Sequence, residues 1–161
     1  MKLPNKLWLR ILVGLVLLLI AAGISLFIKE SLDEQDPETS LPLIYVTYDG
    51  TDLPGVYRAG YSWSFFTTIA KNTPTLAPED IPLTPVDMYA GTELKIHFSS
   101  KQSTLKISLA EGQYSNDYTV LSDVDNGVLN APSSAGVYVY RVEASWSSRG
   151  SIIYYFCVRI L

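Results

Sequence analysis

The chain is poor in the side chains that build metal centres and acid–base pairs, because it has one cysteine and one histidine in 161 residues. A structural zinc site takes about four ligands, mostly cysteine or histidine, and a disulfide takes two cysteines. We therefore expect Cys157 to be a small buried apolar side chain. His97 alternates with charged neighbours along a predicted strand, so we expect it to face solvent. The sequence predicts no metal site and no cofactor.

Clusters of basic side chains are also missing. Residues 41–161 carry eight basic and eleven acidic side chains, and the whole chain has a formal net charge of −4 at pH 7. Proteins that bind nucleic acid present a concentrated positive surface to the phosphate backbone. We therefore expect no nucleic-acid partner.

What the chain does have is one long apolar run near its start. Residues 11–28 contain no charge and one polar side chain, Ser25. A run of about 18 apolar residues is just long enough to cross a bilayer as a helix. It predicts a transmembrane signal anchor over 11–28, and the lipid bilayer is the first partner that we expect. A cleaved signal peptide stays open as an alternative, because residues 21–23 (Ala-Ala-Gly) fit a cleavage site.

The charges beside the apolar run predict its orientation. Lys2, Lys6 and Arg10 precede it, whereas residues 29–40 carry five acids and one lysine. Positive flanks stay on the cytoplasmic side of a membrane. We expect a cytoplasmic N-terminus over 1–10, an acidic stalk over 29–40 and an extracytoplasmic domain over 41–161, so that the protein is single-pass in the cell membrane.

After residue 40 the apolar period is two, as in strands, and we find no amphipathic helix pattern. Two alternating segments, 136–146 and 151–161, are joined by a short link that ends in Gly150 and predict a hairpin. The segments 93–99 and 105–109 alternate in the same way and predict a second hairpin. Asn126-Gly127 predicts a tight turn. We expect an all-β fold, an immunoglobulin-like Greek-key β-sandwich of about seven or eight strands.

Residues 42–161 resemble the small extracytoplasmic immunoglobulin-like domains of Gram-positive bacterial surface proteins and lipoproteins. The resemblance is carried by Gly60-Tyr61-Ser62-Trp63, by the proline-rich loop that follows, and by the closing stretch Gly136-x-Tyr138-x-Tyr140-x-Val142-x-Ala144-x-Trp146, Gly150 and Tyr154-x-Phe156-x-Val158. Gly136-x-Tyr138 also resembles a tyrosine corner, without the cysteine that follows it in antibody domains. The resemblance implies the fold and a location in the cell envelope, and it implies no reaction. The chain departs from the lipoproteins in having an apolar helix and no cysteine to carry lipid.

The proline-rich loop over 67–85 is the first candidate for a binding surface, because long loops on a rigid sandwich often carry recognition. Within it we single out Thr75, Glu79 and Asp80. Tyr114 and Tyr118 lie in a polar loop and are further binding candidates, since flat rings stack on other flat surfaces, sugars among them.

We expect a non-enzymatic interaction module that binds a protein or an envelope polymer. A carbohydrate-binding module is the alternative, although Trp63 and Trp146 lie in alternating sets that predict core positions. A sortase-like transpeptidase built on Cys157, His97 and Arg159 is a third hypothesis, which the residues around Cys157 do not favour. We predict no catalytic residue.

Overall fold

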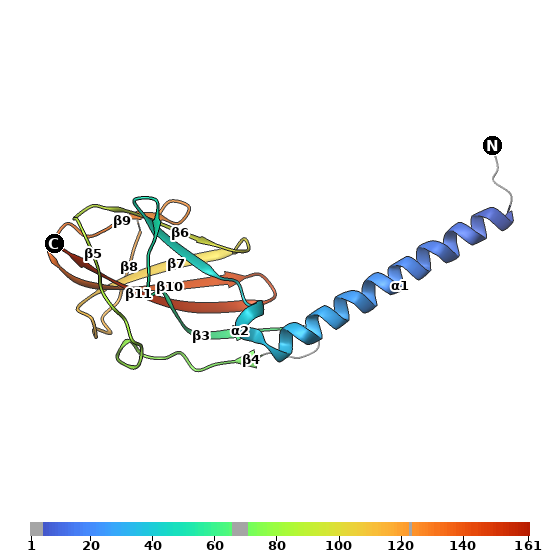
Figure 1. The fold of residues 1–161 in the computed structure, drawn as a ribbon, viewed down its shortest axis with the longest axis horizontal. Coiled ribbons are helices and arrows are strands. Elements are labelled where there is room, and N and C mark those ends of the chain that lie inside the picture. The colour runs from blue at the N-terminus through green and yellow to red at the C-terminus, as the bar shows by residue number, and fades with distance from the viewer. Residues whose placement is uncertain (1–4, 66–70, 123) are drawn as a thin grey trace. The chain divides into compact units, whose positions relative to one another are not determined.

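The structure of the chain is a computed structural model, and it describes residues 5–65, 71–122 and 124–161. It divides into two compact units. One contains the N-terminal helices and reaches Leu41, and the other begins at Pro42 and contains the strands (Figure 1). Each unit is described by itself.

The helical unit begins with α1, Asn5–Gln35, a helix of 31 residues. The stretch Lys6–Gln35 has a mean hydropathy of 3.0 in its most apolar window, and none of that window is buried. At about 1.5 Å per residue the apolar run is about 27 Å long, close to the thickness of a bilayer core. The helix is therefore long and apolar enough to cross a membrane, a property that it shares with signal sequences.

The structure adds secondary structure to the acidic segment 29–40. The helix α1 continues into it as far as Gln35, and the short helix α2, Pro37–Ser40, follows. Proline fits the first turn of a helix because the N–H that it lacks would have no partner there. The stalk that the sequence predicts is thus largely helical.

The strands form two layers, which confirms the predicted β-sandwich. The smaller sheet has the order β2-β1-β6-β9, and the larger sheet has the order β4-β3-β11-β10-β7-β8, with β5 paired to β11 in parallel (Figure 1). Most neighbours within a sheet are distant along the chain, as in a Greek-key sandwich. The bounds of the strands are β1 Ile44–Tyr48, β2 Thr51–Asp52, β3 Tyr57–Trp63, β4 Lys71–Asn72, β5 Val86–Met88, β6 Glu93–Phe98, β7 Thr104–Glu111, β8 Thr119–Val120, β9 Val128–Asn130, β10 Gly136–Trp146 and β11 Gly150–Ile160.

The described residues form eleven strands, more than the seven or eight expected. Five of the eleven are very short, with only two or three residues each. These short strands are pieces of loop that pair with the longer strands beside them. The six longer strands carry most of the period-two patterns in the sequence.

The hairpin of β10 and β11 is confirmed. The two strands pair without interruption from Gly136↔Ile160 to Trp146↔Gly150. Gly150 has a φ of 142°, and a Cβ there would lie 1.9 Å from the backbone oxygen of Ser62, so only glycine fits at this position. The even-numbered side chains of both strands are buried between the sheets.

The second predicted hairpin, over 93–99 and 105–109, is wrong. Strand β6 belongs to the smaller sheet and pairs with β1 and β9, whereas β7 belongs to the larger sheet and pairs with β10 and β8. The chain crosses between the layers at residues 99–103. Both strands send alternate apolar side chains into one interior from opposite sides, and alternation by itself does not distinguish that arrangement from a hairpin.

Aromatic side chains fill the end of the sandwich near Pro42. The ring of Trp146 lies 5.6 Å from Trp63 and 5.3 Å from Phe98, centroid to centroid. The Tyr154 hydroxyl donates a hydrogen bond to the Pro42 backbone oxygen at 2.6 Å. Both tryptophans are buried, which confirms their predicted core positions. At the opposite end, the Tyr138 hydroxyl donates to the Ser134 backbone oxygen at 3.1 Å, which is the kind of bond that a tyrosine corner makes.

Candidate functional site

The proline-rich loop is held along the outer edge of the larger sheet. Its first four residues, 67–70, lie outside the described part of the chain. Beyond them the Thr73 N–H donates to the Tyr61 oxygen at 2.8 Å and the Leu76 N–H donates to the Ala59 oxygen at 2.9 Å. The segment crosses directly over Gly60, where a Cβ would lie 2.8 Å from the Cα of Thr75. Thr75 itself is exposed.

The second half of this loop covers a hydrophobic core on the outer face of the larger sheet. A single turn of 3₁₀ helix, Pro78–Asp80, buries Pro78. Ile81 and Leu83 follow and are also buried, in a cluster with Ala59, Val139, Tyr155 and Cys157. The loop is therefore partly a structural cover, and the side chains that it leaves exposed include those of Glu79 and Asp80.

The polar loop after β7 packs beside this cover. The Gln113 side-chain amide donates to the Leu83 oxygen at 2.8 Å. The Tyr118 ring packs against the same cluster, 6.1 Å from the ring of Tyr155. Tyr114 has 63% of its surface exposed. Two stretches that the sequence singled out separately thus meet on one face of the β unit.

Of the five predicted binding residues, the structure brings Tyr118 and Glu79 within electrostatic range of each other. Burial raises the pKa of Tyr118 well above its usual value, and the charge of Glu79 raises that pKa further, whereas Arg141 lowers it. Thr75, Asp80 and Tyr114 are exposed. The Tyr118 hydroxyl is buried, and no described residue accepts or donates a hydrogen bond to it.

Tyr155 shares this environment. Burial raises its pKa, and a hydrogen bond and the charge of Arg141 oppose that rise. Arg141 also forms an ion pair with Glu143, to which Lys106 lies 3.5 Å away on the neighbouring strand. The raised pKa values keep both phenols protonated at neutral pH. The exposed carboxylates of Glu79 and Asp80 can accept hydrogen bonds from a partner.

The structure does not assemble the residues of the transpeptidase hypothesis. Cys157 is 1% exposed, and burial raises the pKa of its thiol to about 11, although Arg159 lowers it. A cysteine nucleophile needs a lowered pKa and access to solvent. His97 lies on the outer face of the smaller sheet, stacked on Tyr45 with the ring centroids 5.0 Å apart. Cys157 and His97 therefore face away from each other on opposite layers.

The burial of Trp63 and Trp146 also bears on the carbohydrate hypothesis. Both indoles pack inside the sandwich, so neither presents a flat face to a sugar. Trp8 is the remaining tryptophan, and it lies in α1. The exposed aromatic candidate that the sequence proposed is then Tyr114.

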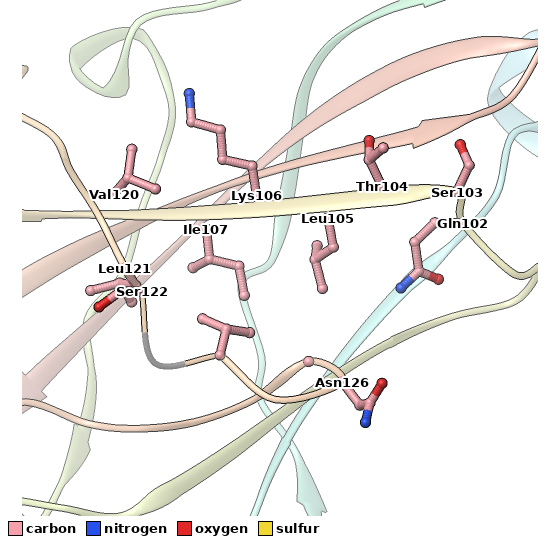
Figure 2. Close-up of a pocket in the computed structure, with 12 residues that line it drawn as sticks. Gln102, Ser103, Thr104, Leu105, Lys106, Ile107, Val120, Leu121, Ser122 and Asn126 are labelled. Atoms are coloured by element: carbon pink, nitrogen blue, oxygen red, sulfur yellow. The ribbon is translucent and has the colours of Figure 1, made fainter.

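A groove that the sequence did not predict opens at the side of the sandwich. It has a volume of about 450 Å³ and lies between residues 102–107 and a second group of residues, which are Val120, Leu121, Ser122, Val124, Asn126 and Gly127. Figure 2 shows that Leu105, Ile107 and Gln102 point into the space below β7, whereas Lys106, Thr104 and Val120 point to its other side. Leu105 and Ile107 match the pattern of core residues. Their alternation contains no signal that a groove lies beside them.

Comparison with family models, with curated proteins and with solved structures finds no match to this chain.

Proposed function

We propose that the protein is a membrane-anchored interaction module whose β unit lies outside the cytoplasm and binds a protein or an envelope polymer without catalysing a reaction. The observation that carries the anchor is the exposed apolar surface of α1. Large side chains along it, such as Leu17 and Leu18, are more than 60% exposed. An apolar helix that is not covered by protein is stable when it is surrounded by lipid.

Charge supports the proposed orientation. Lys6 and Arg10 lie at the start of α1, and Glu30, Asp33 and Glu34 lie near its end. The positive-inside rule then keeps the N-terminus in the cytoplasm and carries the β unit across the membrane.

Three exposed side chains on the loops support binding through loops, and we call them the rim: Glu79, Asp80 and Tyr114. Its members are presented by segments that are fixed to the sheet, through the backbone bonds of the proline-rich loop and through the Gln113 amide. A surface that is ordered before it binds loses little entropy on binding. Glu79, Asp80 and Tyr114 are the side chains that this rim offers to a partner.

The proposal is tested with a photoreactive residue placed at Asp80 or at Tyr114 in the full-length protein, in cells that make it. The control position is Lys95, whose side chain is 60% exposed on the smaller sheet. The proposal predicts discrete adducts from the two rim positions and none of the same mass from Lys95. Identical adducts from all three positions, or none from the rim, would contradict it.

A further inference from the structure

A row of short polar side chains crosses the outer face of the larger sheet. The register places each member directly opposite the next on five neighbouring strands, β7, β10, β11, β3 and β4 (Figure 1). Residues that stand opposite each other on paired strands carry their side chains on the same face of the sheet. We call these residues the polar row, and they are Thr104, Ser145, Ser151, Ser62 and Asn72.

The polar row lies on the surface of the β unit. Trp146 and Ile152, the residues that follow Ser145 and Ser151 along the chain, are buried between the sheets. Side chains alternate between the two faces of a sheet, so the polar row points outward. Ser145 is partly buried, and the other four members are exposed. The row is therefore open to a ligand.

The chemistry of the polar row suits a ligand that is rich in hydroxyl groups. Hydroxyl and amide side chains both donate and accept hydrogen bonds. No member carries a charge that would select a polyanion, and no member offers the large apolar surface that an apolar peptide would bury. A neutral polysaccharide presents hydroxyl groups that donate and accept in the same way, so among envelope polymers it is the one that this surface matches.

The spacing of the polar row suits a flat, linear chain of sugars. Neighbouring strands lie about 4.8 Å apart, so the row is regular and about 19 Å long from Thr104 to Asn72. In an extended glycan with equatorial bonds on opposite sides of each ring, one sugar advances the chain by close to one strand spacing. Such a chain laid across the strands would place one sugar on each step of the row, about four in all.

Bonds within the β unit order one end of the polar row. The hydroxyl groups of Thr104 and Ser145 share a hydrogen bond, and the Ser103 hydroxyl donates to the Ser145 backbone oxygen at 2.9 Å. Each hydroxyl has two acceptor sites and one donor, so one bond leaves capacity for a ligand. A surface that is ordered in advance loses little entropy when it binds.

The next residues on the same face border the polar row on one side. Gly60 is two residues before Ser62 on β3, and the chain at Thr75 crosses directly over it. On β7, Lys106 is two residues after Thr104 and is exposed. Thr75, which the sequence predicted as a binding residue, thus lies beside this surface.

We propose that the polar row binds a neutral, linear polysaccharide of the cell envelope, laid across the five strands with one sugar on each step. This inference rests on the proposed function, because it names the kind of polymer and the surface that meets it. Hydrogen bonds carry the recognition, and each contributes little by itself. A single site is therefore weak, and several copies of the protein in one membrane bind one polymer chain together.

The test is an NMR titration of the full-length protein in lipid nanodiscs with β(1→4)-linked N-acetylglucosamine oligomers of one to six sugars. Affinity should rise with each sugar up to about four and then level off, because longer chains extend past the row. Oligomers of α(1→4)-linked glucose, which coil, are the control ligands and should not bind. This measurement uses the unaltered protein, so it does not depend on whether a variant folds.

Two variants remove hydroxyl groups from the polar row and keep a side chain that strands favour, Ser62→Val and Ser151→Val. Each should weaken binding of the four-sugar oligomer about fivefold. The matched control is Thr51→Val, at an exposed position of β2 in the smaller sheet, and it should leave binding unchanged.

The inference is overturned if no β-linked oligomer binds, if affinity does not depend on length, or if the three variants bind equally. If the photoreactive rim positions still give adducts in that case, the proposed function stands and only the polysaccharide site is wrong. If the rim positions give none either, the proposed function fails with it.

Discussion

Replacing Tyr140 with phenylalanine should stabilise the β unit. Tyr140 is fully buried in the middle of β10, and its ring stacks on Phe156 with centroids 4.6 Å apart and planes 9° from parallel. Its hydroxyl is buried, and no described residue forms a hydrogen bond with it. Burial accordingly raises the pKa of Tyr140 well above its usual value. The substitution keeps the ring and removes only the unpaired polar group.

The size of the effect follows from the cost of that group. A buried polar group without a partner costs about 1–3 kcal/mol, and removal of the oxygen gives part of this back because a small void remains. We expect the free energy of unfolding to rise by about 1 kcal/mol, which corresponds to an increase in Tm of about 4 °C for a domain of this size.

Two other tyrosines provide matched controls. The Tyr154 hydroxyl is buried and bonded to the Pro42 oxygen, and the Tyr138 hydroxyl is bonded to the Ser134 oxygen. Tyr154→Phe and Tyr138→Phe should each lower the free energy of unfolding by about 1 kcal/mol, because each leaves a carbonyl without its donor. The same chemical change is therefore predicted to have opposite signs at positions within one core.

The assay is urea denaturation of the full-length protein in nanodiscs, followed by the fluorescence of the core tryptophans, with circular dichroism as the second probe. If Tyr140→Phe lowers stability as much as Tyr154→Phe does, the hydroxyl has a partner in the folded protein, such as a buried water, and the reasoning is refuted.

Three further outcomes are expected. Gly60→Ala should lower the free energy of unfolding by about 2 kcal/mol in the same urea assay, because its Cβ would lie 2.8 Å from the Cα of Thr75; an unchanged midpoint would contradict the close crossing. Gln113→Ala should lower the free energy of unfolding by about 1 kcal/mol, because it removes the hydrogen bond to the Leu83 oxygen. It should also speed amide hydrogen exchange in the proline-rich loop. Equal exchange rates in the variant and the unaltered protein would show that this bond does not stabilise the loop. Cys157 should resist alkylation until the protein unfolds. Burial raises the pKa of Cys157 to about 11 from about 9 in the unfolded chain, so its contribution to stability is present below pH 9 and is lost as pH rises toward 11. Cys157→Ala should make the decline over that range shallower, and an identical decline would contradict it.

The parts of the fold that follow from the sequence are those specified by local patterns. The alternation in β10 and β11 places their even-numbered side chains inside, and the structure buries them. Asn126-Gly127 forms the expected turn, with φ values of 51° and 84°, both in the left-handed region. That combination is typical of the type I′ turn, for which Asn-Gly is favoured.

The parts that the sequence does not predict depend on which elements meet. Nothing in β6 and β7 shows that they belong to different layers, because either arrangement buries the same side chains. The apolar residues of the proline-rich loop have no period, so Ile81 and Leu83 give no signal that they cover a second core. Packing against Val139 and Tyr155 determines their burial.

The sequence predicts some residues of the candidate site but not how they are placed relative to one another. The sequence named Glu79 and Tyr118 from separate loops, and the sheet between those loops brings them to one face. It did not name Arg141 or Tyr155, whose place on the outer side of the strands follows from the register. The groove beside Leu105 is lined by residues of β7 together with residues that follow β8, and no local pattern shows that these stretches lie side by side.

The central claim is that α1 anchors the protein with its β unit outside the cytoplasm. Single cysteines at Ser133, which is exposed in a loop of the β unit, and at Lys6 test it directly in intact cells, since the native Cys157 is buried. A maleimide that does not cross membranes should label Ser133→Cys and leave Lys6→Cys unlabelled until the cells are opened. Labelling of Lys6→Cys in intact cells with Ser133→Cys protected would contradict the account.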